Sequence, residues 1–432
     1  MAISKQPPLP ILPAYRPVAF ELYFDTLTTA SRGENAVVTI FKNGVSVTDK
    51  PIRFQSSRNE PSPLAPLTDT RWFFEVDIQK YCQDTLAPYT NLPSGFVNPA
   101  TRHVPNLDMF AVYHITATYE IVDLTTGILE DSAIDQDISD EFSVFSASKT
   151  NLESMFLNDY YGTFGGITTL FLTKSSRSLS ICREENVYLS FISPPDSPIG
   201  LRTMLVSLFD SSGGLLSQGV ASIQGGTSFQ SSVNVGVSSL DSVGFYFDGT
   251  PDFSDIELSY YTISVGTTDI LGGAIANYVQ QSEEFTYTLI GSCCANRSLR
   301  LHWMNLLGGI DSYTFKFDKD LQISTKSESG KQALGWNIGS TSPHKASSEG
   351  LYKYNSTTKE QYLLSSDLLK NSDALWLSEL LGSPKVYIDV DNSFTLIACK
   401  VGDTTQSMSR NEGKIRYNIT VTLSNNRINH RL

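Results

Sequence analysis

The residue types that carry out acid–base, nucleophilic or metal chemistry are scattered along this sequence. The five histidines are widely separated, and none has the H-E-x-x-H spacing or another zinc-binding spacing: His103, His114, His302, His344 and His430. The G-x-S-x-G turn that exposes a nucleophilic serine is absent. No glycine pair belongs to a phosphate-binding motif. We therefore predict a protein that is not an enzyme and that holds no cofactor and no metal.

Two groups of acidic residues keep other chemistry open. Asp248, Asp252 and Asp255 lie close in sequence, and paired carboxylates can cleave glycosidic bonds, so a polysaccharide depolymerase is one alternative function. Residues 130–141 hold six acids that offer oxygen ligands for Ca²⁺, among them Asp135, Asp137, Asp140 and Glu141. Their spacing lacks the glycine and the final glutamate of an EF-hand, so a solvated acidic loop is the favoured interpretation.

The charge balance argues against nucleic acid as a partner. The 432 residues include 45 Asp and Glu against 32 Lys and Arg, a formal net charge of -13. The basic residues are scattered, whereas binding to nucleic acid through released counterions needs a basic face. An acidic surface attracts basic protein partners instead, although it constrains them weakly.

The cysteines and the first residues bear on the compartment. The five cysteines form an odd set without a C-x-x-C spacing, which predicts reduced thiols and folding in the cytosol: Cys82, Cys182, Cys293, Cys294 and Cys399. Prolines interrupt the opening sequence MAISKQPPLPILP, so it lacks the apolar stretch of a signal peptide. No window reaches about 18 consecutive apolar residues, so no membrane insertion is predicted.

The elements that must position any site are strands. Charged residues make up only 18% of the chain, and its length points to about three domains. We predict a mainly β, multi-domain protein of β-sandwich-like modules, with one or two short helices in the C-terminal third. The predicted parts are a Pro-rich extended arm (1–17), an N-terminal β-sandwich-like domain (18–145), a middle β domain (146–290) and a C-terminal β-rich domain (291–432).

Local patterns predict individual elements. Phe20, Leu22 and Phe24 alternate, as do the apolar residues from Tyr113 to Ile121 and from Ile415 to Leu423, which indicates half-buried strands. Asn43-Gly44 between apolar runs predicts a hairpin turn, as do residues 210–214.

One helix is predicted near 373–381. Ser372 or Asp373 is the expected N-cap, and Gly382 and Pro384 end the helix. Its apolar stripe consists of Leu375, Trp376, Leu380 and Leu381, with Glu379 on the opposite, outward face.

Three irregular segments are candidates for contacts between subunits. Residues 6–17 carry five prolines and predict either an extended arm across a neighbour or a disordered tail. Residues 82–108 form a long aperiodic loop, and residues 211–240 are rich in Ser and Gly, as in a sheet close to another surface or in a flexible loop. The individual candidates for intersubunit contact are Pro8, Pro10, Pro13, Tyr15, Tyr89, Phe96, Trp303 and Asn305.

The last third carries a resemblance to a known family. Residues 301–315, LHWMNLLGGIDSYTF, resemble a signature with W-x-N-x-x-G-G-x-D in virion proteins of tailed bacteriophages that infect Bacteroidetes. Residues 374–384, ALWLSELLGSP, followed by Val386-Tyr387, are similar to the family's helix-to-strand unit, and residues 413–423 to its closing strand. Residues 74–81, FEVDIQKY, show a weaker resemblance to an F-x-D-I-x-x-x-Y element of the family.

The resemblance implies a tail, neck or baseplate protein in a ring around the tail axis, with crAss-like virions as one setting. The resemblance implies no catalytic residues in this chain. The expected function is therefore a structural component of a virion tail that acts through symmetric assembly, with other tail proteins as partners. The expected location is the virion tail, after synthesis in the bacterial cytoplasm. A receptor-binding or glycan-binding tail protein is the competing interpretation, since exposed aromatic side chains could stack on sugars.

Overall fold

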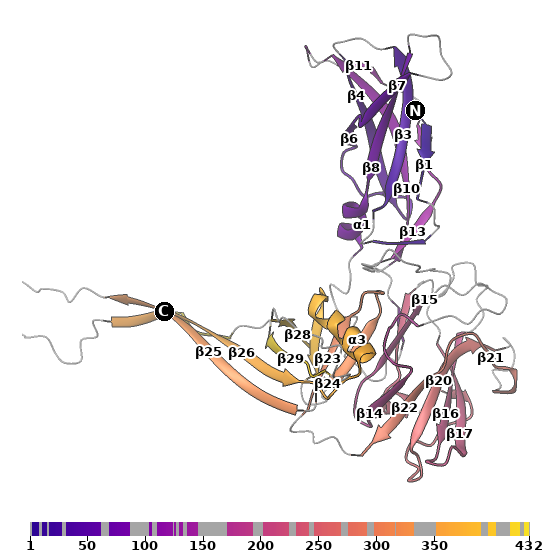
Figure 1. The fold of residues 1–432 in the computed structure, drawn as a ribbon, viewed down its shortest axis with the longest axis vertical. Helices are drawn as coiled ribbons and strands as arrows, with labels where there is room; N and C mark the ends of the chain where they lie inside the picture. Colours follow the sequence, from indigo (N-terminus) through magenta and orange to yellow (C-terminus); the bar gives the residue numbers. More distant parts are fainter. Residues whose placement is uncertain are drawn as a thin grey trace, which may run out of the picture.

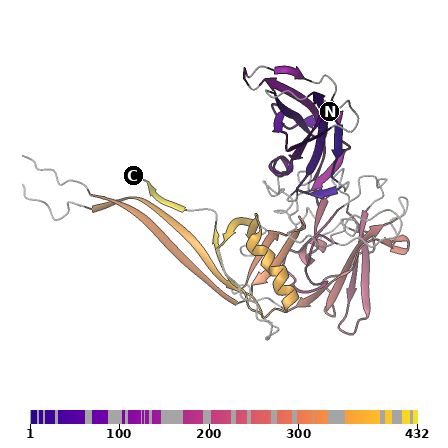
Figure 2. The ribbon, with the colours of Figure 1, turned by 45° about the horizontal axis from the view of Figure 1, so that its top comes forward.

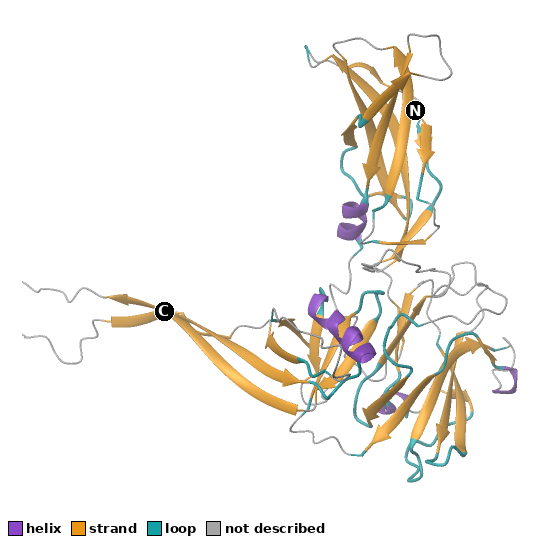
Figure 3. Cartoon of the chain, viewed as in Figure 1, coloured by secondary structure: helices purple, strands orange, loops and turns teal. Residues whose placement is uncertain are grey.

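The computed structural model is mainly β, with several sheets and short helices (Figure 1, Figure 3). It describes residues 2–7, 11–14, 17–27, 32–61, 69–86, 103–105, 110–123, 125–126, 129–132, 136–145, 171–192, 202–223, 230–241, 246–268, 275–291, 298–315, 317–331, 351–389, 396–402, 415–423 and 427–431. Buried apolar side chains form separate cores within residues 12–144, 171–287 and 299–421, which we call the N-terminal, middle and C-terminal domains. The predicted fold class is confirmed.

The N-terminal domain is a sandwich of two sheets. One sheet contains, in order, β1 (Ala2–Lys5), β3 (Ala19–Leu27), β8 (Asp69–Asp77) and β7 (Arg58–Pro61). The other contains β2 (Ile11–Pro13), β13 (Phe142–Phe145), β10 (Phe110–Asp123), β4 (Arg32–Lys42) and β5 (Val45–Ser46), with β6 (Ile52–Gln55), β11 (Leu129–Ser132) and β12 (Asp137–Ile138) beside this path. Helix α1 (Gln79–Thr85) follows β8. Alternate residues of β3 and β10 are buried in one core, as the pattern predicts: Phe20, Leu22, Phe24, Tyr113, Ile115 and Ala117.

The Asn43-Gly44 turn joins β4 to β5 as predicted. Asn43 has a φ of 50° and Gly44 a φ of 78°. A two-residue hairpin turn of this kind needs positive φ at both central positions, which Asn and Gly adopt most readily. The antiparallel pairing of Phe41 with Ser46 confirms the hairpin.

The proline-rich N-terminal segment packs on its own domain. β1 pairs with β3, and Ile3 N donates to Asp137 Oδ2 at 2.7 Å. β2 pairs in parallel with β13 at the edge of its sheet, which is where a sheet tolerates a proline such as Pro13. Leu12 is buried in the N-terminal core. The expectation of a free arm or tail over residues 1–17 is therefore corrected for its described parts, because they complete the two sheets of the domain.

Two acids of the predicted acidic loop, Asp137 and Asp140, bind this segment. Asp137 accepts from Ile3, as above, and Asp140 Oδ2 accepts from Gln6 Nε2. Asp140 N donates in turn to Gln6 Oε1 at 3.1 Å. Asp135 lies outside the described residues. Among the residues that the structure describes, no group of three or more His, Cys, Asp or Glu side chains could hold a metal ion.

The middle domain combines a large sheet with a small one. The large sheet contains, in order, β14 (Ser178–Cys182), β22 (Phe285–Ile290), β20 (Tyr260–Thr267), β16 (Arg202–Phe209), β17 (Leu215–Ser222) and β19 (Tyr246–Asp248), with β21 (Val279–Gln280) beside β20. The small sheet contains β15 (Tyr188–Ile192), β18 (Gln230–Asn234) and β9 (His103–Pro105). The short helices α2 (Val237–Leu240) and η3 (Ile275–Asn277) complete the domain.

Two predicted contact segments are used inside the chain. β9 comes from the 82–108 loop and pairs antiparallel with β18, so this part of the loop binds the middle domain of its own chain. The described parts of residues 211–240 build β17, β18 and α2, and Val220 and Val233 are buried in the middle core. The hairpin predicted at residues 210–214 is confirmed by the pairing of β16 with β17.

The described residues of the C-terminal domain form one sheet and one helix. The sheet contains, in order, β24 (Ile310–Phe315), β23 (Leu299–Met304), β27 (Val386–Asp389), β28 (Leu396–Val401), β29 (Asn418–Leu423), β26 (Leu351–Ser365) and β25 (Phe317–Lys331), and β30 (Arg427–Arg431) also pairs with β26. Helix α3 (Asn371–Gly382) packs on this sheet through Trp376 and Leu380. The predicted strand at residues 415–423 is confirmed over β29.

The helix exists as predicted, but its cap and its faces differ. Lys370 is the N-cap, because Ala374 N already donates to the Lys370 carbonyl at 2.9 Å. Leu375 is 59% exposed, whereas Glu379, expected on the outward face, is only 7% exposed. These corrections arise because contacts from distant parts of the chain decide which face of a helix is buried.

The cysteine prediction is corrected in part. Cys82 and Cys399 are free and buried, whereas Cys182 is disulfide-bonded. Cys293 and Cys294 lie outside the described residues. Across the described ranges, none of the helices is both long enough and apolar enough to cross a membrane.

Candidate assembly site

Two side chains predicted for an intersubunit surface are buried inside the protomer. Trp303 is 1% exposed and Asn305 is 3% exposed, so the prediction is wrong for both. Pro13 lies in the edge strand β2. The remaining candidates lie outside the described residues: Pro8, Pro10, Tyr15, Tyr89 and Phe96.

Asn305 organises the tight turn that joins β23 to β24. Its Oδ1 accepts hydrogen bonds from the backbone N–H groups of Leu307 and Gly309, both at 2.9 Å. Gly308 has a φ of 82°, and a Cβ on Gly309 would lie 2.3 Å from the carbonyl oxygen of Leu172. Asn305 Nδ2 donates to that same carbonyl at 2.6 Å. The Asn and the two glycines of the motif therefore serve the turn and its close approach to the middle domain.

Asp311 connects the same hairpin to helix α3. Trp376 Nε1 donates to Asp311 Oδ2 at 2.7 Å, and the Trp376 ring packs on Trp303 with centroids 5.3 Å apart. Burial raises the pKa of the Asp311 carboxyl to about 7, although hydrogen bonds from Thr173, Trp376 and Asn305 oppose the shift. At neutral pH this carboxyl group is therefore protonated in a large share of molecules.

An ion pair is buried where β23 meets the middle domain. Arg300 Nη1 lies 3.1 Å from Glu185 Oε2, and both side chains are 6% exposed. Arg300 also donates from Nε to the Asn186 carbonyl and from Nη1 to Thr314 Oγ1, each at 2.6 Å. Glu185 accepts from Thr314 Oγ1 at 2.6 Å and from Cys182 N at 3.0 Å. Because the partners of these two charges come from both domains, separating the domains would leave buried charges without compensation.

His302 extends this polar contact along β23. Its Nδ1 lies 2.7 Å from Ser312 Oγ, and its Nε2 lies 4.0 Å from Asp389 Oδ2. The ring packs edge-on against Tyr188, with centroids 5.4 Å apart, and Asn186 Nδ2 donates to Asp389 Oδ2 at 3.3 Å. Burial lowers the pKa of His302, so its ring is neutral at pH 7 and serves packing.

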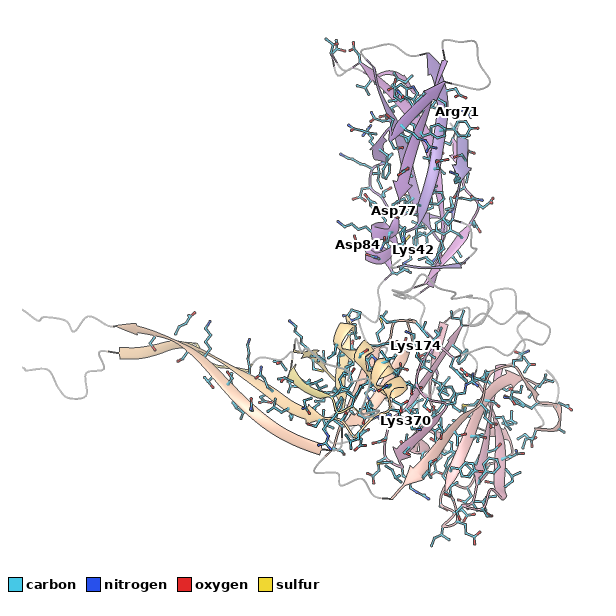
Figure 4. All side chains as sticks on the ribbon, in the orientation of Figure 1. Lys42, Arg71, Asp77, Asp84, Lys174 and Lys370 are labelled. Carbon is cyan, nitrogen blue, oxygen red and sulfur yellow. The ribbon has the colours of Figure 1, made fainter. Side chains whose placement is uncertain are left out.

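Glu379 closes the contact from the side of helix α3. Its Oε1 lies 2.7 Å from Lys174 Nζ, and its Oε2 accepts from Leu306 N at 3.1 Å. Lys174 belongs to the middle domain and is labelled beside α3 in Figure 4. The carboxylate thus joins the helix, the β23–β24 turn and the middle domain.

We call this set the interdomain joint, and it consists of Lys174, Glu185, Asn186, Arg300, His302, Asn305, Asp311, Thr314, Glu379 and Asp389. Sequence reasoning missed most of it. Arg300 and His302 alternate with Leu301 and Trp303, which predicts one exposed face for the strand, yet every residue of β23 is buried. Asn305 and Asp311 could be recognised in the sequence as positions of the motif. The residues of the middle domain that they contact could not be recognised there.

The second feature is a projecting pair of strands. β25 and β26 pair antiparallel over most of their length, and their distal parts extend away from the C-terminal domain (Figure 1). Residues 322–329 of β25 are all exposed, including Ile323 at 63%. A strand with one covered face would show alternating exposure. Neither face of this part of β25 is therefore covered, and β25 is also the edge of its sheet.

The projecting strands leave on the side opposite the middle domain. Figures 1 and 2 both place them to the left of the C-terminal domain and the middle domain to the right. β26 is anchored at its base through pairing with β29, from Gln361 to Ser365. We call the part beyond this anchor the ribbon: residues 321–331 and 351–360, with β30 alongside.

The acids weighed as a catalytic group bind separate backbone groups: Asp252 and Asp255 hold local turns, and Asp248 holds the more distant helix η3. Asp252 Oδ1 accepts from Ser254 N at 2.9 Å, and Asp255 Oδ1 accepts from Glu257 N at 2.9 Å. Asp248 Oδ2 accepts from Ile275 N. Asp252 and Asp255 thus bind backbone of their own surroundings, as turn-forming Asp residues do.

Comparison with models of known protein families gives no match, and comparison with curated proteins gives none. A proposal of function therefore rests on two structural features, the interdomain joint and the ribbon.

Proposed function

We propose that the chain is a structural, non-enzymatic subunit that assembles with copies of itself into a ring, as part of the tail, neck or baseplate of a bacteriophage virion. The ribbon is the main observation that supports this proposal. It is a long pair of strands whose described β25 face and edge lie in solvent.

Such a ribbon is a poor element for an isolated molecule. A narrow ribbon of strands without a covering layer has little stability of its own in water, and the open edge of β25, with unpaired N–H and C=O groups, invites pairing with other chains. Both costs fall when a partner covers the ribbon. A ribbon that is anchored at its base and exposes residues 322–329 of β25 beyond it is therefore expected in a subunit that is completed by assembly.

The interdomain joint supports the same proposal. Its buried ion pair and hydrogen bonds fix the middle and C-terminal domains against each other, so the ribbon leaves the body in a defined direction. A ring closes only when each contact repeats the same rotation, and rigid subunits keep that rotation constant.

The virion setting rests on the resemblance of residues 301–315 and 374–384 to phage virion proteins. Mass spectrometry of purified phage particles from a lysate that expresses the gene tests it. We expect the chain in the particle fraction, in several copies per particle. A chain found only in the soluble lysate would contradict the virion setting but not self-assembly.

Shortening the ribbon tests self-assembly. Replacing residues 325–358 by Asn-Gly joins Ser324 to Lys359, which face each other in the ladder, and keeps the anchored base. We expect annular particles of the full chain in negative stain, and a monomer with an unchanged thermal transition for the shortened chain. A full chain that stays monomeric at high concentration would contradict the proposal.

A further inference from the structure

Charge is distributed unevenly between the ribbon and the rest of the chain. The ribbon, with β30, holds six Lys or Arg residues against two Glu, in a chain whose net charge is -13. Lys326 and Lys359 are exposed and lie on one face, because Lys359 is opposite Ser324 and strand neighbours two apart share a face. The ribbon is thus a basic element on an acidic protein.

Most of the middle domain has the opposite character, although Arg183, in the turn after β14, donates from Nη1 to the Phe253 carbonyl at 2.6 Å. Residues 203–290 contain nine Asp or Glu and no Lys, Arg or His. Four of these acids lie in two adjoining connections, β16–β17 and β19–β20: Asp210, Asp252, Asp255 and Glu257. The connections meet, since Ser259 N donates to the Phe209 carbonyl at 2.9 Å and Asp252 N donates to Ser217 Oγ at 3.3 Å. We call these four acids and their connections the acidic tip.

The acidic tip and the ribbon also each expose apolar side chains. Ile256 in the acidic tip is 97% exposed, and Leu215, the first residue of β17, is 53% exposed. Ile323 on the ribbon is 63% exposed. An apolar contact with charged groups around it is the usual composition of a protein interface. Lys326 and Lys359 lie on the other face of the ribbon from Ile323, whose partner in the ladder is Glu360. The lysine face of the ribbon is therefore the one that complements the carboxylates of the acidic tip in sign.

The geometry prevents both surfaces from meeting within one chain. The ribbon and the middle domain lie on opposite sides of the C-terminal domain in both views (Figure 1, Figure 2). The interdomain joint holds that separation. A contact between ribbon and acidic tip therefore joins two copies, and it leaves one ribbon and one acidic tip free for further copies.

We propose that the ribbon of one subunit docks on the acidic tip of the next, in a head-to-tail contact that repeats around the assembly. This inference rests on the proposed self-assembly and names the two surfaces that make it. A head-to-tail contact generates a ring when its rotation closes.

Two charge variants of the full chain test the contact. The ribbon variant is K326E/K359E, and the tip variant is I256K/E257K, which changes exposed side chains and keeps the Asp carboxylates that hold the turns. We expect each variant alone to associate at least about tenfold more weakly than the unchanged chain in sedimentation velocity. Mixing the two should restore the contact between the unchanged ribbon of the tip variant and the unchanged tip of the ribbon variant, and the reversed ribbon and reversed tip are again opposite in sign. The expected product is a mixed complex that contains the two variants in a 1:1 ratio.

A matched control reverses the same charge elsewhere. Lys50 and Lys80 are exposed in the N-terminal domain, so K50E/K80E changes the net charge as the ribbon variant does, and it should assemble like the unchanged chain. If the unchanged chain assembles and the ribbon variant assembles equally well, the docking inference is wrong while self-assembly stands. Two monomeric variants that form no complex on mixing would also overturn it. A monomeric unchanged chain would instead refute the proposed function itself.

Discussion

Removing the buried charge at residue 300 tests the interdomain joint most directly. Arg300→Met keeps an unbranched side chain but leaves the Glu185 carboxylate buried without its cation. Removal of one partner from a buried ion pair costs about 3–5 kcal/mol. Glu185 keeps hydrogen bonds from Thr314 Oγ1 and Cys182 N, so we expect the lower end, about 3 kcal/mol.

Urea unfolding followed by circular dichroism measures this change. We expect R300M to lower the midpoint of the transition that includes the middle and C-terminal domains, with an unchanged N-terminal transition. The double variant E185L/R300M should recover most of the loss, because replacing both charges by apolar groups removes the uncompensated carboxylate.

The N-terminal domain offers a matched control. Arg53 Nε lies 2.7 Å from Glu120 Oε2, but its side chain is 61% exposed, so Arg53→Met should cost less than about 1 kcal/mol. Equal losses in R300M and R53M would refute the argument from burial. A double variant no more stable than R300M would show that the loss comes from packing and not from the unpaired charge.

Two further substitutions test the motif that builds the joint. Gly309→Ala places a Cβ 2.3 Å from the Leu172 carbonyl oxygen, so it should lower the free energy of unfolding by at least about 2 kcal/mol in a thermal unfolding experiment. The control Gly382→Ala, whose Cβ would have nothing within 4 Å, should leave that free energy nearly unchanged. Asp311→Asn should flatten the pH dependence of stability. The folded pKa of about 7 exceeds the ordinary Asp value of 3.8, so the unfolded chain loses its proton first. The unchanged protein therefore loses stability as pH rises between these two values, by up to about 4 kcal/mol. Parallel pH profiles for both proteins would contradict this.

The local elements of the fold were predictable because local residues decide them. Asn43 and Gly44 adopt positive φ at little cost, so they produce the hairpin wherever they occur between strand-forming residues. The alternation in β3 and β10 predicts which side chains are buried, because successive residues of a strand face opposite sides. The helix at 371–382 was found in place, since its apolar residues and its C-terminal Gly specify a helix without help from other elements.

The site was predicted only in its pattern. The W-x-N-x-x-G-G-x-D motif could be read, but Trp303 and Asn305 were assigned to a surface because a single sequence does not show what covers a strand. Glu379 was assigned to the outer face of the helix for the same reason. Its partners, Lys174 and Leu306, are 205 and 73 residues away in the chain.

The order of the residues was enough to show that this protein is made of strands and where its main turns fall. Only the tertiary structure decided that Arg300 and Glu185 meet inside the protein, that the first residues complete their own domain, and that the ribbon projects away from the middle domain. The physical reason is the range of the interactions. Backbone preferences and alternation act over a few neighbouring residues, whereas burial, ion pairing and the direction of a projecting element depend on residues that only folding brings together.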